Sequence, residues 1–242
     1  MSIRSICSII GFLFVFQLGG QTSFPYQFKS STESILLGTG LLTSGISYYL
    51  DKKIEPITLE QINRLNINQI PSFDRYATQY YSVKAHQISN ISGLASIAFP
   101  IVVLWGKRKD KDRDKLMLIA LEGAFLNFGL VNLSKTLSKR VRPYVYNENV
   151  PLDVKMVQKS RYSFFSGHTS LSAYFTFVGA QMYSDLYPNS NKKTLVWAVA
   201  AALPLITAYS RVRAGKHFAT DVLVGYAVGA VSGILIPRVH RF

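Results

Sequence analysis

The sequence predicts an all-α protein, a six-helix transmembrane bundle preceded by a signal peptide, and three observations support that prediction. Six apolar segments follow an apolar N-terminus, and each approaches the roughly 17–25 residues with which a helix crosses the hydrocarbon of a bilayer. Backbone groups in hydrocarbon must be hydrogen-bonded within their own segment, which favours helices over strands. The chain of 242 residues is 48% hydrophobic with a mean hydropathy of +0.17, and it contains no stretch suited to a soluble domain.

The N-terminus has the three parts of a secretory signal. Arg4 supplies a positive charge, residues 7–18 (CSIIGFLFVFQL) form a short apolar core, and the small residues of GGQTS follow. We therefore expect a signal peptide over residues 1–21 and a single membrane-embedded domain over residues 22–242; an uncleaved anchor is the alternative. Cys7 is the only cysteine, so we expect no internal disulfide and no cysteine zinc site.

The apolar segments that we expect to span are approximately residues 34–50, 88–105, 116–133, 168–186, 194–209 and 222–236. The first is the least apolar, because several glycines, serines and threonines interrupt it. In the last, Gly225, Gly229 and Gly233 recur at every fourth position and give one helix face a smooth strip, which allows a neighbouring helix to pack closely.

Residues 51–87 form a long outer connection between the first two segments. Thr58 and Gln61 have the spacing of a capping box, so a helix is expected to begin there. Further along, one helical face would collect four apolar or aromatic residues: Phe73, Tyr76, Ala77 and Tyr80. Such a helix suits the plane of the membrane interface, and a small helix packed on the end of the bundle is the alternative.

Basic residues set the expected orientation. Lysine and arginine outnumber aspartate and glutamate by 27 to 13, and many of them lie in residues 106–115, 188–193 and 238–242. The positive-inside rule makes this side cytoplasmic and places 51–87, 134–167 and 210–221 outside. No basic helix stands free of the apolar segments, so no nucleic-acid partner is expected. A cleaved signal would reverse this orientation unless residues 34–50 fail to span completely, and their weak hydrophobicity favours that resolution.

Polar residues with phosphate chemistry gather in two of the outer loops. Lys135, Arg142 and Arg211 are cations at helix mouths, and guanidinium and ammonium groups both bind phosphate oxygens. Ser166 and Gly167 precede an apolar helix, whose N-terminal N–H groups form an anion site that glycine leaves open. Any one of these cations alone is more often a structural residue that reaches toward headgroups.

Two histidines complete this set of groups. His217 and Asp221 are four residues apart, so on a helix the carboxylate would hold one imidazole nitrogen and leave the other free to attack phosphorus. His168 could protonate the leaving oxygen. The spacing favours His217 as the nucleophile without settling which histidine attacks. A histidine at a helix end is usually only solvated, but here all the groups are expected on one side of the membrane.

These residues resemble a known three-part signature. Lys135-x6-Arg142-Pro143, then Ser166-Gly167-His168, then Ser210-Arg211-x5-His217-x3-Asp221 is similar to the motif set of the type 2 phosphatidic acid phosphatase superfamily, over about residues 116–236. One position departs from the pattern: Phe165 stands where the family usually has proline.

The resemblance implies a bacterial inner-membrane, multi-pass lipid phosphatase whose active site faces the periplasm, with no metal or other cofactor. His217 would form a phosphohistidine, Asp221 would orient it and His168 would act as general acid. The phosphate would be held by Lys135, Arg142, Ser166, Gly167, His168 and Arg211. Transfer to an acceptor other than water, and binding or transport without catalysis, are the alternatives. The lipid and the oligomeric state are open.

Other polar residues have weaker assignments. Glu122 lies inside an apolar segment and is expected to be a buried hydrogen-bonding residue. Asn127 and Asn132 are expected between helices. Four residues near the two loops could touch lipid phosphate or shape a pocket: Tyr144, Tyr146, Arg213 and Lys216.

Overall fold

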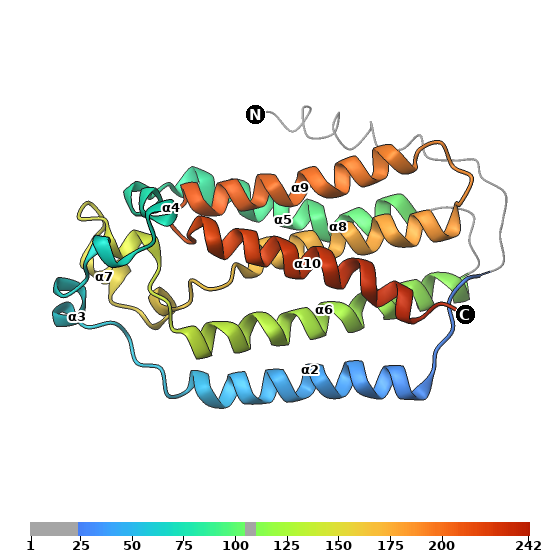
Figure 1. Cartoon of the computed structure of the whole chain (residues 1–242), viewed down its shortest axis with the longest axis horizontal. Helices are drawn as coiled ribbons and strands as arrows, with labels where there is room; N and C mark the ends of the chain where they lie inside the picture. Colours follow the sequence, from blue (N-terminus) through green and yellow to red (C-terminus); the bar gives the residue numbers. More distant parts are fainter. Residues whose placement is uncertain (1–23, 105–109) are drawn as a thin grey trace.

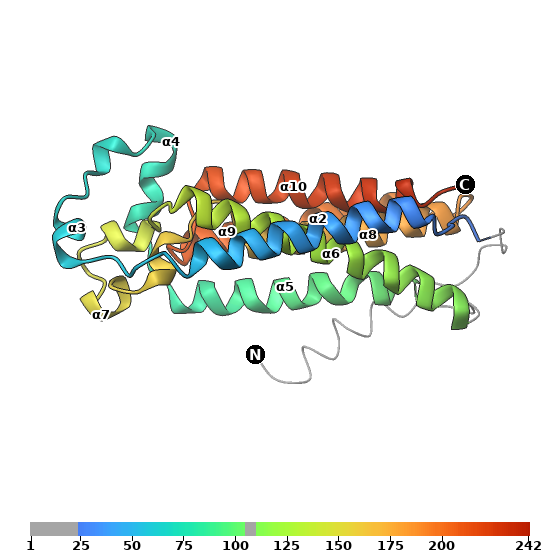
Figure 2. The same cartoon turned by 90° about the horizontal axis from the view of Figure 1, so that it is seen from below.

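The computed structural model describes residues 24–104 and 110–242, so the expected signal peptide at residues 1–21 lies outside the described part. Six long helices run side by side in alternating directions (Figures 1 and 2). They are α2 (Ser30–Asp51), α5 (Val83–Leu104), α6 (Asp110–Ser138), α8 (Gly167–Leu186), α9 (Lys193–Arg213) and α10 (Ala219–Val239). Each contains one of the apolar segments predicted from the sequence, except that Trp105, the last residue of the second segment, lies outside the described residues.

Helix α8 lies at the centre of the bundle and contacts α5, α6, α9 and α10. The glycine strip of α10 packs against it, as predicted. A Cβ added to Gly225, Gly229 or Gly233 would come within 2.1–2.7 Å of an α8 or pre-α8 carbonyl oxygen. Small residues therefore bring the two helices that begin at the candidate site into close contact.

Within residues 24–104 and 110–242, four helices are long and apolar enough to cross a membrane, and they correspond to α5, α6, α9 and α10. The two exceptions among the six have a physical explanation. Helix α8 is buried by its neighbours and carries polar pairs instead of lipid-facing side chains, such as Ser172 with Ser96 at 2.5 Å. Helix α2 buries Gly40, Thr43 and Ser47 and exposes leucines on its outer side.

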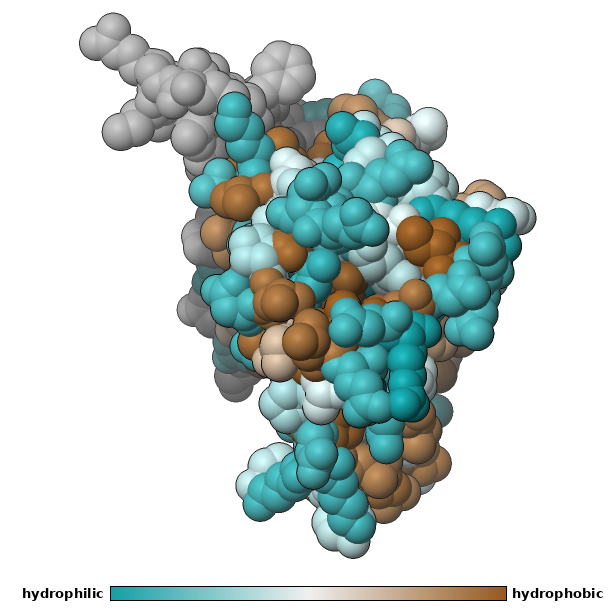
Figure 3. Space-filling model, turned by 90° about the vertical axis from the view of Figure 1, so that its left-hand side faces the viewer, coloured by the Kyte–Doolittle hydropathy of each residue, from teal (hydrophilic) through white to brown (hydrophobic). Residues whose placement is uncertain are grey.

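The outer surface of the bundle is apolar. Large hydrophobic side chains exposed on α2, α5 and α9 include Leu41, Ile91, Leu94, Leu195 and Leu205, each more than half exposed. Such an apolar band on long, aligned helices fits a hydrocarbon environment, and the protein is therefore membrane-embedded and multi-pass. By contrast, the end that carries α3, α4 and α7 shows mainly hydrophilic residues, with hydrophobic ones between them (Figure 3).

Short helices cover that hydrophilic end. They are α3 (Leu59–Asn63), η1 (Ile67–Gln69), α4 (Ser72–Arg75), η2 (Tyr76–Gln79), η3 (Pro143–Tyr146), α7 (Leu152–Lys155) and η4 (Gln158–Arg161). The capping box of Thr58 and Gln61 is confirmed at the start of α3.

The helix expected around residues 73–80 is broken into two short pieces, α4 and η2. Phe73 and Tyr76 are exposed whereas Ala77 is fully buried, and Tyr80 follows in extended conformation, so the prediction of one continuous aromatic face is wrong. The reason is a tertiary contact: buried Asp74 accepts hydrogen bonds from the N–H and hydroxyl of Thr220. This contact fastens the segment to the end of the bundle. The alternative, a small helix packed on the end of the bundle, fits the structure.

Candidate active site

Every residue predicted for phosphate chemistry lies at the hydrophilic end of the bundle. Lys135 is in the last turn of α6, Arg211 is in the last turn of α9, and Asp221 is in the first turn of α10. The two motif-bearing loops meet there, because the N–H of Ser166 donates to the carbonyl oxygen of Asp221 at 3.0 Å. The antiparallel order of the helices and the α8–α10 packing bring these distant segments together.

His217 precedes α10 rather than lying in it, which corrects the helical-face argument for the His217 and Asp221 pair. Its Nδ1 lies 2.7 Å from the carbonyl oxygen of Ser163 and 3.8 Å from Oδ2 of Asp221. A carbonyl oxygen only accepts, so Nδ1 carries the hydrogen and Nε2 keeps the lone pair. The backbone of Ser163, and not the carboxylate, therefore fixes the orientation of the imidazole.

Asp221 does not hydrogen-bond His217 directly but contacts the residues that do or that adjoin it. Its Oδ2 accepts from the hydroxyl of Ser163 at 2.5 Å and from the N–H of Phe218 at 2.8 Å, and its Oδ1 accepts from Arg140 at 2.6 Å. The segment around Ser163 and the residue after His217 therefore both donate hydrogen bonds to one buried carboxylate. Asp221 thus positions the histidine through the Ser163 segment.

Arg140 is a site residue that sequence reasoning missed. It bridges Asp221 and Asp74, at 2.6 and 2.7 Å, and its guanidinium lies over the ring of Phe218 at 4.2 Å. The only sequence feature that indicated a role for Arg140 in the site is its position between Lys135 and Arg142. Its partner Asp74 lies 66 residues away in sequence, in an outer connection without a readable motif.

The Ser-Gly-His turn has the form of an anion site. Ser166 caps α8 and accepts from the N–H of Thr169 at 3.4 Å. A Cβ added to Gly167 would lie 3.2 Å from Nζ of Lys135 and 2.9 Å from Val131, so glycine is needed for the ammonium group to approach the helix N-terminus.

Phe165, in the position where the related motif usually has proline, has a contact that proline lacks. Its N–H donates to Oγ of Ser134 at 2.9 Å, and that hydroxyl donates to the carbonyl of Phe164 at 3.0 Å. Ser134 adjoins Lys135 on α6. The backbone hydrogen bond therefore connects the segment before the Ser-Gly-His turn to the helix that carries the lysine.

Three cations at this end have no acidic partner. No described acid lies within salt-bridge distance of Lys135, Arg142 or Arg211. Arg211 is 3% exposed, and its Nη1 lies 3.0 Å from Nδ1 of His86, a second residue that the sequence did not single out. Buried cations without counterions are costly, and a bound anion would offset that cost.

The two histidines lie near the same cations, Arg211, Arg142 and Lys135, but differ in exposure. His168 is exposed at the start of α8, where it can exchange protons with water. His217 is 1% exposed, and burial together with Arg211, Arg142 and Lys135 holds the pKa of its imidazole well below 6.5. The same cations therefore lie near His217, and its imidazole is neutral at neutral pH.

Comparison with known proteins decides the family. The PAP2 superfamily matches residues 115–242, which is more than half of the chain. The chain belongs to the PAP2 superfamily. The resemblance predicted from the three motifs is thereby confirmed.

Two individual relatives of known name share about 30% of their residues with this chain over the matched parts. Phosphatidylglycerophosphatase B of Bacillus subtilis is 29% identical over 160 residues, which cover 62% of this chain and 73% of that protein. Lipid A 4'-phosphatase of Porphyromonas gingivalis is 30% identical over 83 residues, 34% of this chain and 31% of that protein.

Two solved PAP2 structures are also similar. The transmembrane phosphatidylglycerolphosphate phosphatase from Bacillus subtilis is 21% identical with a TM-score of 0.49, over 82% of this chain and 94% of that one. LpxE of Aquifex aeolicus is 22% identical with a TM-score of 0.45, over 68% and 92%.

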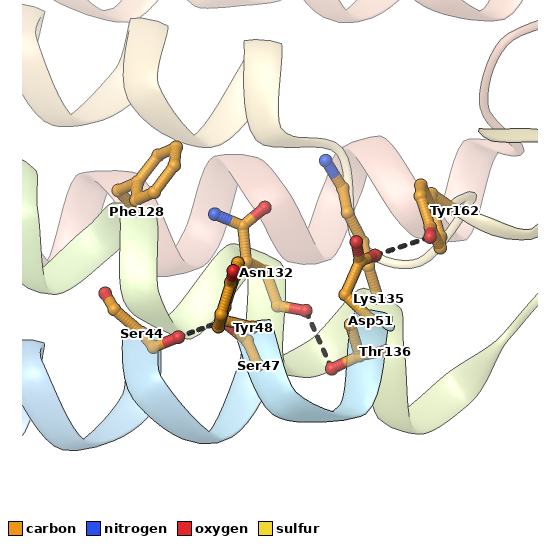
Figure 4. Close-up of a pocket in the computed structure, with 9 residues that line it drawn as sticks. All are labelled: Ser44, Ser47, Tyr48, Asp51, Phe128, Asn132, Lys135, Thr136 and Tyr162. Atoms are coloured by element: carbon orange, nitrogen blue, oxygen red, sulfur yellow. Dashed lines mark hydrogen bonds between the residues drawn. The ribbon is translucent and has the colours of Figure 1, made fainter. Parts of the chain in front are cut away.

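A pocket of about 250 Å³ adjoins the PAP2 motifs between α2 and α6 (Figure 4). Its lining mixes hydroxyl, amide, carboxylate and aromatic groups: Ser44, Ser47, Tyr48, Asp51, Phe128, Asn132, Lys135, Thr136 and Tyr162. Tyr162 donates to Asp51 at 2.5 Å across its rim. Lys135 extends away from α2 toward the start of α8, so one side chain connects the pocket with the Ser-Gly-His turn.

The depressed pKa of His217 predicts a pH-dependent stability. The folded protein keeps the imidazole neutral, while the unfolded chain binds a proton below pH 6.5. The contribution of this histidine to the free energy of unfolding is therefore fully present above pH 6.5 and declines as the pH falls. Between pH 7.5 and 5.5, wild type should lose about 1 kcal/mol more stability than His217→Gln. Unfolding of both proteins in detergent at the two pH values measures this; equal losses would contradict the buried neutral histidine.

Proposed function

We propose that this PAP2 protein is an integral-membrane phosphatase that hydrolyses a lipid phosphate or diphosphate through a phosphohistidine, without a metal at the reacting phosphate. One observation carries the proposal. Three cations without acidic partners converge with a neutral, oriented histidine at a helix N-terminus. Binding alone would need only the cations, whereas the fixed tautomer of His217 serves nucleophilic attack.

The first step transfers the phosphoryl group to the protein. Nε2 of His217 forms a bond to phosphorus while the bond from phosphorus to the leaving oxygen breaks, and His168 donates a proton to that oxygen. Lys135, Arg142 and Arg211 stabilise the charge on the equatorial oxygens, together with the N–H groups at Ser166 and Gly167. Nδ1 keeps its hydrogen bond to Ser163, which stabilises the phosphorylated imidazole.

The second step releases phosphate. His168, now deprotonated, accepts a proton from water as the water oxygen attacks phosphorus, and the bond between phosphorus and Nε2 breaks. The exposure of His168 supports this dual role, because the leaving group and then water must both reach it. Inorganic phosphate and the neutral histidine result.

A lipid substrate is supported by the location of the pocket. The α2 and α6 helices that line it also expose large apolar residues, including Leu41 and Leu121. A lipid in the bilayer could therefore place its phosphate beside Lys135 and its adjacent polar groups in the pocket. The relatives named above as phosphatases of phosphatidylglycerophosphate and lipid A suggest candidate substrates.

The orientation in the membrane follows from charge. The end opposite the site carries Lys192, Lys193, Arg238 and Arg241, and the positive-inside rule makes it cytoplasmic. The site then faces the periplasm of a bacterial inner membrane. A periplasmic reporter fused after Asn191 is expected to be inactive, and an active fusion would reverse the assignment.

The direct test is phosphate release from purified protein in detergent. Undecaprenyl pyrophosphate, phosphatidylglycerol phosphate, phosphatidate and lipid A are offered in parallel with EDTA present. At least one should be hydrolysed, and vanadate should compete because it mimics the phosphorus centre. Failure with all four substrates, in a protein that remains folded, would contradict the proposal.

The pocket makes a separate prediction about lipid access. Ser47→Phe fills space beside Lys135, so KM for the preferred lipid should rise about tenfold while hydrolysis of a small soluble phosphate ester changes little. Leu42→Phe, on the outer side of α2 where Leu42 is 64% exposed, is the matched control. Equal effects of Ser47→Phe on both substrates would assign the residue a general structural role.

A further inference from the structure

Three ionisable residues cluster at the end of the bundle opposite the candidate active site. Glu33 is in the first turn of α2, Glu122 is in α6, and His240 follows α10. Nε2 of His240 lies 3.3 Å from Oε1 of Glu33 and 3.3 Å from Oε2 of Glu122. The three nearest ligand atoms lie within 4.8 Å of one another. Glu122 is thirteen residues before Lys135, or about 20 Å along the helix.

Four atoms of this cluster are buried without a hydrogen-bond partner among the described residues, although Glu33 as a residue is partly exposed. His240 is 1% exposed and Glu122 is 6% exposed. Both carboxylate oxygens of Glu33, Oε2 of Glu122 and Nε2 of His240 are buried without a partner. Glu122 is buried as predicted, but Oε2 is not hydrogen-bonded. Burial of unpaired polar groups costs free energy, so the cluster calls for a ligand.

The orientation of His240 indicates which kind of ligand. Nδ1 lies 2.8 Å from the carbonyl oxygen of Ile236, so Nδ1 carries the hydrogen and Nε2 presents its lone pair to the two carboxylates. A lone pair facing two carboxylates is unfavourable unless a positive charge, a proton on Nε2 or a metal ion, lies between them. Nε2 makes no hydrogen bond to a described residue, which favours the metal ion. Metal-binding histidines commonly donate their other N–H to a backbone carbonyl in this way.

The distances fit a metal ion. Bonds of about 2.0–2.2 Å from zinc to nitrogen and oxygen place neighbouring ligands of a tetrahedral ion about 3.4 Å apart, close to the two 3.3 Å separations. Two carboxylates would neutralise a divalent cation, which suits a buried site. A nitrogen ligand beside two oxygens favours a transition metal over Mg²⁺ or Ca²⁺, and zinc binds such mixed sites more tightly than manganese or iron(II).

We propose that Glu33, Glu122 and His240 bind one structural Zn²⁺ ion. The ion joins α2 to α6 and α10 and fastens the start of α2 to the end of the chain. Neighbouring contacts converge on the same point: the N–H of Gln27 donates to the carbonyl of His240 at 2.7 Å, and the ring of Phe28 meets that of His240. Because the ion lies far from His217, its removal should weaken the fold while a brief assay with EDTA retains phosphatase chemistry.

The test is zinc binding by the full chain, purified in detergent without a polyhistidine tag, stripped with EDTA and then titrated with Zn²⁺. Elemental analysis should find one zinc per chain, with a melting temperature raised by about 5 °C or more. Co²⁺ in place of zinc should give the absorption bands of a tetrahedral site. His240→Ala and Glu122→Gln should lose the zinc and the shift.

Two variants serve as controls. Glu148→Gln, in an exposed loop at the other end, and His217→Ala should both retain one zinc per chain. Wild type that takes up no zinc would overturn the proposal, because the carboxyl groups then share a proton instead. Zinc uptake by folded Glu122→Gln equal to wild type would also overturn it, and Glu33→Gln, at a half-exposed helix start, repeats this test if Glu122→Gln misfolds.

Discussion

His217→Ala should lower phosphate release by at least about 10³-fold, since it removes the atom that forms the bond to phosphorus. The loss should appear in kcat, because the cations and the α8 N-terminus that bind the phosphate remain. Substrate hydrolysis by the purified variant, with vanadate binding measured alongside, separates the chemistry from binding. Retained vanadate affinity with lost turnover is the expected pattern.

Arg213→Ala is the matched control from the same loop. Arg213 is exposed, and its guanidinium lies over the ring of Tyr80 at 4.1 Å. It is not one of the three cations that we propose to bind the phosphate. Its loss should change activity by less than about threefold. If His217→Ala and Arg213→Ala are equally active, His217 is not the nucleophile.

Asp221→Asn should lower kcat by about 10²–10⁴-fold, as expected when a histidine loses the carboxylate that positions it. The carboxylate faces donors on both sides, Arg140 on one and Ser163 with the Phe218 N–H on the other. Whichever way the new amide turns, its NH₂ group meets a donor. The Ser163 carbonyl should then shift, and with it the imidazole of His217.

The same change should cost about 1–3 kcal/mol of stability, because a buried donor loses its acceptor. Steady-state kinetics and unfolding in detergent measure the two effects. Asp153→Asn, in α7 at the same end, is the control and should leave both unchanged. A destabilised Asp221→Asn with full kcat would mean that Asp221 only supports the fold.

The sequence predicted the bundle well because lipid imposes simple rules on a chain. Long apolar segments become helices, and the four-residue glycine spacing predicted the close contact of α10 with α8. Motif residues at helix ends were predicted to gather on one side, since the number of spans between them fixes their end of the bundle. Residues 168–186 were predicted as one of six apolar spans, and their central place as α8, where polar side chains pair with neighbouring helices, was not predicted.

Tertiary contacts account for what the sequence did not reveal. The interval between His217 and Asp221 suggested a shared helical face, whereas His217 lies before α10 and the carbonyl of Ser163 holds it. A backbone acceptor leaves no trace in side-chain spacing. Asp74 and Arg140 likewise meet only after folding, so their link to Asp221 could not be predicted from either segment.

The covalent intermediate is the most direct test of the proposed mechanism. The protein is mixed briefly with the preferred lipid substrate, radiolabelled at the terminal phosphate, and quenched in alkali, where phosphohistidine persists. Peptide mapping should find acid-labile label on the peptide that contains His217 and none in His217→Ala. Rapid turnover without label at His217, or label on His168 instead, would contradict the account.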